Sequence, residues 1–199
     1  KGTHAILIGL DKITAKSTKI VVNLDEAKKF GPLEIKILKC GKVKTNNKIN
    51  AIVDDLSAPA LEKAYELDTL SKKGKFKGPL HGVPITIKEN IDQKGYATPN
   101  GLEALKDLIA PGNAPVVDNL EQDGAIVIGR TNTPEFSMRG TTDNVIHGRT
   151  YNPWNDWASP GGSSGGASAA VMSGMGSLAH GNDIAVSLII PSTATGACT

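Results

Sequence analysis

The stretch Ala125-Ile126-Val127-Ile128-Gly129 decides the fold class, because a continuous run of apolar and small residues suits a β-strand that is covered on both faces. Immediately upstream, residues 114–122 fit a helix whose Val116, Val117 and Leu120 face inward. Still earlier, residues 83–87 indicate a second short buried strand. Because strand and helix patterns alternate along the chain, the sequence predicts an α/β fold.

A further helix is expected from Leu56, with Ser57 as its N-cap, Pro59 in its first turn and Gly74 at its end. A turn over residues 78–82 then leads into the first buried strand. These signals place Lys88 at the end of that strand.

Downstream, residues 167–175 predict a helix of small residues, and residues 177–179 predict another short strand. The first 46 residues differ in character, since they mix β-like runs such as residues 19–24 with lysine-rich polar segments and carry no motif that we can name. We therefore divide the chain into an N-terminal segment, residues 1–46, and a larger region, residues 47–199.

Composition narrows the class of protein. The 199 residues are 39% hydrophobic and 21% charged, which is ordinary for a soluble globular protein. The 22 basic and 20 acidic residues are spread along the chain, so we expect no nucleic-acid partner. No apolar run approaches the roughly 18 residues of a spanning helix, and residues 5–10 are too short for the core of a secretory signal. We expect no membrane association.

The two cysteines are Cys40 and Cys198, which lie far apart and form no Cys-x-x-Cys pair. Neither a disulfide framework nor a zinc site is therefore indicated, and a reducing compartment is favoured. The sequence predicts a cytoplasmic location.

A glycine-rich run, Gly161-Gly162-Ser163-Ser164-Gly165-Gly166, precedes the small-residue helix. Its glycines permit backbone angles closed to other residues and let main-chain amides approach a ligand. The helix that follows adds free amides at its N-terminus. Two other interpretations remain open: a flexible linker, or a phosphate-binding loop, which would lack the usual Gly-Lys-Ser/Thr.

Acyl-transfer chemistry needs a nucleophile and a base. Ser163 and Ser187 are candidate hydroxyls, and Lys88 is a candidate base if burial beside Ile85 and Ile87 lowers its pKa enough to keep the amine neutral. Each residue also has an ordinary interpretation, namely a solvated lysine at a strand end and polar serines without a special role. The four histidines lie in unrelated contexts and do not form a triad pattern.

Four separated blocks together resemble the amidase signature family of hydrolases. They are Gly78 to Asn90, Gly124 to Asn132, Asn152-Pro153-Trp154, and Ser159 to Gly166. The resemblance runs from about Lys48 to Thr199, whereas residues 1–46 do not look like the helical start usual in that family. It implies a mixed β-sheet core covered by helices on both faces, with residues 47–199 forming the N-terminal part of the catalytic domain.

The resemblance also implies a Ser-cisSer-Lys triad. By position, Ser187 matches the nucleophile, Ser163 the bridging serine and Lys88 the base. The family holds the peptide bond before its bridging serine in the cis form, which here is the Gly162-Ser163 bond. A neutral Lys88 would draw a proton from Ser187 through Ser163, and the same relay would protonate the leaving amine.

Further site residues follow from the same resemblance. The oxyanion hole would be formed by the backbone amides of Ile184, Ala185 and Val186, together with that of Ser187. Ser164 and Asp183 match positions that support the site without touching the substrate. The resemblance implies a small-molecule amide substrate and no metal or organic cofactor. The oligomeric state stays open, with a homodimer as one candidate.

The sequence departs from the family pattern next to the nucleophile. The family commonly has Gly-Gly just before it and often an arginine two residues after it, where this chain has Ala185-Val186 and Ile189. If that turn needs a positive φ, a β-branched valine is disfavoured there. The chain is also less than half as long as a typical member, so we expect it to be part of a longer protein with apolar sheet surface exposed.

The resemblance implies an amidase that hydrolyses carbon-nitrogen amide bonds to an acid plus an amine or ammonia through an acyl-enzyme. The blocks at residues 140–144 and 180–183 look more like bacterial amidases, aryl acylamidases among them. Two alternatives remain open. One is a catalytically impaired homologue that serves as a binding or scaffold module. The other is a protein similar to the amidotransferase subunit that supplies ammonia for tRNA-linked glutamine synthesis.

Overall fold

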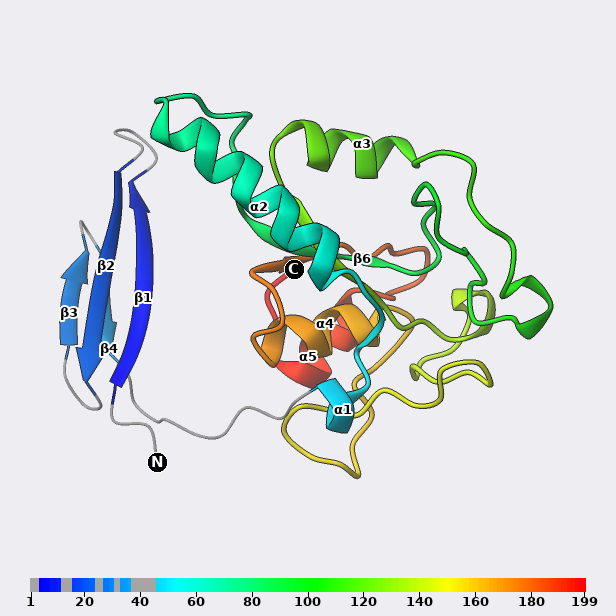
Figure 1. Ribbon diagram of the computed structural model, residues 1–199. Helices are drawn as coiled ribbons and strands as arrows, with labels where there is room; N and C mark the ends of the chain where they lie inside the picture. The colour runs from blue at the N-terminus through cyan, green and yellow to red at the C-terminus, as the bar shows by residue number, and fades with distance from the viewer. Residues whose placement is uncertain (1–3, 12–15, 24–26, 31–32, 37–45) are drawn as a thin grey trace. The chain divides into compact units, whose positions relative to one another are not determined.

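A computed structural model describes residues 4–11, 16–23, 27–30, 33–36 and 46–199, with side chains described from residue 48 onward. The chain divides into two compact units, Lys1–Val43 and Lys44–Thr199. The first unit contains two antiparallel hairpins (Figure 1), formed by β1 (His4–Asp11) with β2 (Lys16–Asn23) and by β3 (Ala27–Phe30) with β4 (Leu33–Lys36). The β-like character of residues 19–23 is confirmed, because they lie in β2; residue 24 lies outside the described residues.

The second unit is built on a four-stranded mixed sheet. Its strands are β5 (Ile52–Asp55), β6 (Pro84–Lys88), β7 (Ile126–Thr131) and β8 (Leu178–Ala179), in the order β5-β7-β6-β8. β6 is parallel to β7 and β8, whereas β5 is antiparallel to β7. The mixed sheet predicted from the resemblance is therefore confirmed, and its register sets Lys88 opposite Thr131.

Five helices belong to this unit: α1 (Asn46–Ile49), α2 (Ser57–Lys72), α3 (Pro115–Gln122), α4 (Gly165–Met172) and α5 (Ile189–Thr195). Two 3-10 turns, Glu103–Leu105 and Glu135–Ser137, lie in the connections. None of the helices described here is long and apolar enough to cross a membrane.

Helices cover both faces of the sheet, as expected. Ile126 packs in one cluster with Ala60 and Leu67 of α2, whereas its neighbour Val127 packs in another with Val117 of α3. Because successive strand residues point to opposite faces, α2 and α3 lie on opposite sides of β7. Residues 126–129 of the predicted run thus lie in β7, a strand covered on both faces, which confirms the α/β assignment made from the run.

Two element boundaries differ from the predictions. Ser57 is the first helical residue of α2 and not its N-cap. Its backbone N–H donates to Asp55 Oδ1 over 2.9 Å, so the carboxylate two residues earlier satisfies a free amide at the helix start. α4 begins at Gly165, so the last glycines of the glycine-rich run belong to the first turn of the helix.

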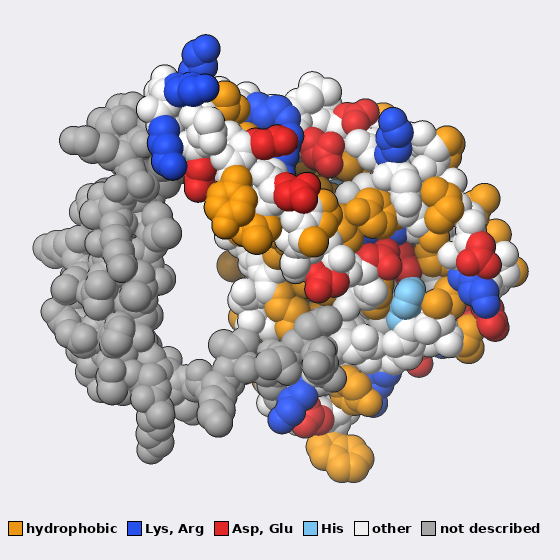
Figure 2. Space-filling view, in the orientation of Figure 1, with side chains coloured by type: hydrophobic (Ala, Val, Ile, Leu, Met, Phe, Trp, Pro, Cys, Tyr) orange, Lys and Arg blue, Asp and Glu red, His pale blue; other side chains and the backbone are white. Residues whose placement is uncertain are grey.

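The face of the second unit shown in Figure 2 carries basic and acidic side chains interspersed with apolar ones. No broad single-sign patch is visible on this face.

Candidate active site

Lys88 lies at the end of β6 with its side chain 0% exposed. Its Nζ donates to Ser163 Oγ over 2.6 Å, to Ser164 Oγ over 3.1 Å and to Asn182 Oδ1 over 2.7 Å. The solvated-lysine interpretation is therefore wrong. The structure brings together Lys88 and the two serines of the glycine-rich run, which are about 75 positions away in the sequence and each 1% exposed.

Burial lowers the pKa of Lys88 to about 8, because an ammonium loses its hydration inside the protein, while the negative charge of Asp183 partly offsets this. A pKa of about 8 leaves roughly one tenth of the amine uncharged at pH 7. The three polar partners keep the side chain in place in either protonation state. Lys88 thus has the protonation behaviour that a base at neutral pH requires.

The glycine-rich run is a fixed loop. The Gly162-Ser163 peptide bond is cis, as the resemblance implies, and Gly161 has a φ of +83° that favours glycine. Thr142 Oγ1 donates to the carbonyl of Gly161 over 2.9 Å and accepts the N–H of Gly165 over 3.1 Å. Because the loop is buried and bonded on both sides, it is not a flexible linker.

Ser187 lies against the same loop through its backbone. Its carbonyl accepts the N–H of Ser164 over 3.2 Å, while Ser164 Oγ donates to the carbonyl of Asn182 over 3.2 Å. The hydroxyl of Ser187 takes part in none of the hydrogen bonds recorded among the described residues, and the residue is partly exposed. The structure therefore brings the segment of Ser187 beside Ser163 and Ser164, and its role as nucleophile stays a prediction.

The carboxylate of Asp183 faces the backbone amides at the start of α5. Its Oδ2 accepts the N–H of Leu188 over 2.8 Å. This bond, with weaker contributions from the amides of Ser187, Ile189 and Val186, holds the pKa of the carboxyl below its usual range. Asp183 is thus ionised beside Lys88 and acts on it through charge.

The backbone amides predicted to form the oxyanion hole differ in whether they already have a hydrogen-bond acceptor. That of Val186 is directed at the carboxylate of Asp183. Those of Ile184 and Ala185 have no partner among the hydrogen bonds recorded for the described part of the chain, and both residues are exposed. Two donors therefore remain available to an external oxygen, and the oxyanion hole stays a prediction.

The turn before Ser187 adopts a left-handed conformation. Val186 has a φ of +59°, where a β-branched side chain is strained. The turn therefore has at residue 186 the positive φ for which a β-branched valine is disfavoured.

Asn182 was missed by the sequence reasoning. Its Oδ1 is one of the three acceptors around Lys88 Nζ, and its carbonyl accepts from Ser164. The only indication in the sequence was that Asn182 directly precedes Asp183, which the resemblance assigns to the site. A second missed contact lies next to Lys88, where the buried Glu89 Oε1 is 2.5 Å from His147 Nε2.

The fold and site define a mixed α/β protein in which a buried lysine at a strand end is hydrogen-bonded to two serines of a cis-containing glycine-rich loop. The family model described as amidase matches residues 39–198. The chain therefore belongs to the amidase family.

Similar proteins include an indoleacetamide hydrolase from Bradyrhizobium diazoefficiens, 56% identical over 154 residues that cover 77% of this chain and 29% of that protein. One subunit of the glutamyl-tRNA(Gln) amidotransferase from Lachnoclostridium phytofermentans is 45% identical over 138 residues, covering 69% of this chain and 28% of that protein.

Among solved structures, a bacterial aryl acylamidase of the amidase signature family superposes with a TM-score of 0.68 at 36% identity, over 74% of this chain and 31% of the other. The chain thus spans about a third or less of the length of the proteins it matches.

Proposed function

We propose that this chain carries the catalytic centre of an amidase, with Ser187 as nucleophile, Ser163 as bridging serine and Lys88 as base. The observation that carries the proposal is the buried Lys88 Nζ, 2.6 Å from Ser163 Oγ. Its lowered pKa supports a role as proton acceptor. The substrate is a small-molecule amide, and the products are an acid and an amine or ammonia.

The partners of Lys88 suggest how the relay runs. As a free amine, Lys88 has two N–H groups and one lone pair. Asn182 Oδ1 can only accept a hydrogen bond, and Ser164 Oγ already donates its proton to the carbonyl of Asn182. The two N–H groups therefore go to Asn182 and Ser164, and the lone pair is left for the proton of Ser163.

The reaction then proceeds in two steps, formation of an ester on Ser187 and hydrolysis of that ester. Ser163 passes its proton to Lys88 and takes one from Ser187, whose oxygen forms a bond to the amide carbonyl carbon. The carbon-nitrogen bond breaks as the relay returns the proton to the leaving amine, which leaves an ester on Ser187. Water adds to that ester with the same relay as base, and the acid departs. The amides of Ile184 and Ala185 would meet the charge on the carbonyl oxygen.

The test is the hydrolysis of an activated anilide by the purified protein, together with mass-spectrometric mapping of an active-serine probe. We expect turnover and labelling at Ser187. Replacing Lys88 by Met or Ser163 by Ala should lower kcat by about 10²–10⁴-fold. Ser177→Ala, at an exposed serine outside the site, should change nothing. Unchanged turnover in Lys88→Met would refute the proposed base.

Two alternative functions are each favoured by a specific observation. Val186 at a φ of +59° favours a catalytically impaired scaffold, because its side chain is held beside the nucleophile where the family commonly has glycine. Absence of both turnover and labelling would support it. The identity to an amidotransferase subunit favours a role in ammonia transfer, and glutaminase activity that appears only with partner proteins would support that.

We also propose a cytoplasmic location and no nucleic-acid partner. The first rests on two cysteines that form no paired motif, and the second on the near balance of 22 basic and 20 acidic residues.

A further inference from the structure

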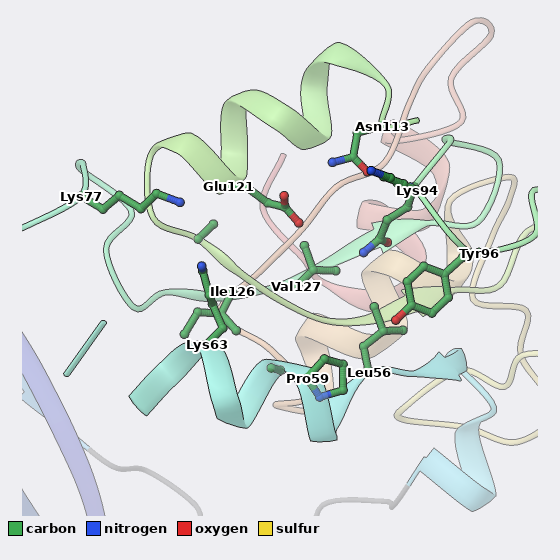
Figure 3. A pocket seen from close by; sticks show the side chains of 13 residues that line it. Leu56, Pro59, Lys63, Lys77, Lys94, Tyr96, Asn113, Glu121, Ile126 and Val127 are labelled. Carbon is green, nitrogen blue, oxygen red and sulfur yellow. The ribbon is translucent and has the colours of Figure 1, made fainter. Parts of the chain in front are cut away.

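A groove of about 390 Å³ lies between α2 and α3 at the edge of the sheet (Figure 3). β5 pairs with β7 from Gly129 onward, so the first part of β7 has no partner from β5. Ala125, Ile126 and Val127 all border the groove. Because consecutive strand residues point to opposite faces, a hollow that both Ile126 and Val127 border runs along the strand edge, between the two helical layers.

The groove combines an apolar surface with a few polar groups. The apolar part is formed by Leu56, Pro59, Ala60, Ala125, Ile126 and Val127. The charged side chains are Lys63, Lys77, Lys94 and Glu121, which give the groove a net charge of +2 (three positive, one negative). Figure 3 shows Lys63 and Lys77 reaching one end of the groove, from α2 and from the segment before β6, with Lys94 and Tyr96 at the other end.

Most of these charged side chains have no ion-pair partner. No ion pair recorded for the described residues involves Lys77, Lys94 or Glu121, while Lys63 Nζ contacts the exposed Glu66 over 2.8 Å. Gln93 also borders the groove; it is 6% exposed, and its Oε1 has no hydrogen-bond partner within the described structure. A buried acceptor without a partner is costly, and water that enters the groove can satisfy it.

We propose that this groove binds a small organic carboxylate, that is, an acid whose carboxylate is attached to an apolar body. Its volume lies within the range of about 300–1,000 Å³ typical of small-molecule sites. The carboxylate lies between Lys63 and Lys77, and the apolar body covers Ala60 and Ile126. An inorganic anion would leave the apolar surface unfilled. A neutral ligand would leave Lys77 without an ion-pair partner, whereas Lys63 would keep its pair with the exposed Glu66.

The groove is separate from the site of Lys88. β6 and β7 run parallel, and the groove borders the residues of β7 that pair with Pro84 and Ile85, whereas Lys88 ends β6. Ile85 and Lys88 are three positions apart along β6, which corresponds to about 10 Å. Ligand binding in the groove therefore does not depend on the proposed amide hydrolysis.

The test is calorimetric titration of the full chain with 2-naphthoate, and with 2-naphthalenemethanol as a neutral analogue of the same apolar shape. We expect the acid to bind more tightly than the alcohol, with an affinity that falls as salt is added. Lys63→Met and Lys77→Met should each weaken binding of the acid by about three- to tenfold. Binding of the alcohol should not change in either variant.

Lys106→Met is the matched control, because Lys106 is exposed, lies outside the groove and pairs with Glu103 at 3.9 Å. It should bind 2-naphthoate like the unmodified chain. Equal affinity for the acid and the alcohol would overturn the proposal, as would unchanged binding of the acid in both groove-lysine variants. Unchanged binding in both variants would also show that the acid binds outside the groove, for example at the site of Lys88.

Discussion

Lys88 sets the pH dependence expected of this site. Its pKa of about 8 lies below the ordinary lysine value because the side chain is buried. The charged form, which dominates below that pKa, cannot accept a proton. We therefore expect kcat/KM for a neutral amide to rise about tenfold per pH unit below 8 and to level off above it. A rate profile between pH 6 and 9, with a neutral anilide, measures this, and a flat or falling profile would contradict the assignment.

Val186 carries backbone strain that a glycine would remove. A non-glycine residue at a φ of +59° costs about 1–3 kcal/mol, whereas the added flexibility of glycine in the unfolded chain costs about 0.5–1 kcal/mol. Val186→Gly should therefore stabilise the protein by about 1 kcal/mol, which raises Tm by about 2–4 °C. Calorimetry tests this, with Val171→Gly in α4 as a control that should lower Tm. A fall in Tm of similar size in both variants would exclude the strain.

At the residue level, the sequence predicted the residues that stand in recognisable blocks. Lys88 and Ser163 were predicted from their blocks, and the structure joins them directly. Asn182 was not, because its contact with Lys88 depends on how the chain turns after β8. No spacing rule relates that turn to the end of β6, so only the three-dimensional structure reveals the third partner of the amine.

α4 depends on close backbone contact made possible by glycine. A Cβ at Gly166 would stand 2.5 Å from the carbonyl oxygen of Asn132 and 2.6 Å from its nitrogen, and neither backbone atom can move aside easily. Alanine is favoured in a helix by about 1 kcal/mol, but overpacking costs about 1–3 kcal/mol. Because the obstructing atoms are backbone, the overpacking cost lies at the upper end of that range, and we expect Gly166→Ala to lower the free energy of unfolding by about 2 kcal/mol, measured by urea denaturation.

Gly112→Ala provides the control, because a Cβ there meets nothing within 4 Å. It should change stability by less than about 0.5 kcal/mol. If the two alanine variants were equally stable, the close approach of α4 to Asn132 would not limit the size of residue 166.

Most elements of the second unit were predictable, while their arrangement was not. The apolar run of β7 and the inward positions of α3 follow from periodicity. The strand order β5-β7-β6-β8 and the antiparallel β5 do not, because pairing joins segments that are distant in sequence. The N-cap at Ser57 was placed one residue too late, because the N–H of Ala60 already bonds to the carbonyl of Leu56 and Asp55 accepts the N–H of Ser57.

The whole chain consists of two units, and the features discussed above lie in the second. The family match begins at residue 39, and the contacts of Lys88 all lie within residues 44–199. We therefore expect a chain without residues 1–43 to fold and to keep its Tm within about 3 °C, a difference of roughly 1 kcal/mol. Thermal unfolding followed by circular dichroism measures this. Loss of the cooperative transition would show that the second unit depends on the first.

Apolar side chains are exposed around the segment of Ser187. Leu178 is 50% exposed, Ile184 99% and Ile189 58%. Exposed apolar surface of this kind favours association.

The central claim is that Lys88 is a buried amine able to lose its proton near neutral pH. The most direct measurement is an NMR titration of the lysine ¹³Cε signals, with Lys88→Met used to assign the signal of Lys88. We predict a midpoint at about pH 8 for Lys88. A midpoint at about 10.4, the ordinary value for lysine, would contradict the account.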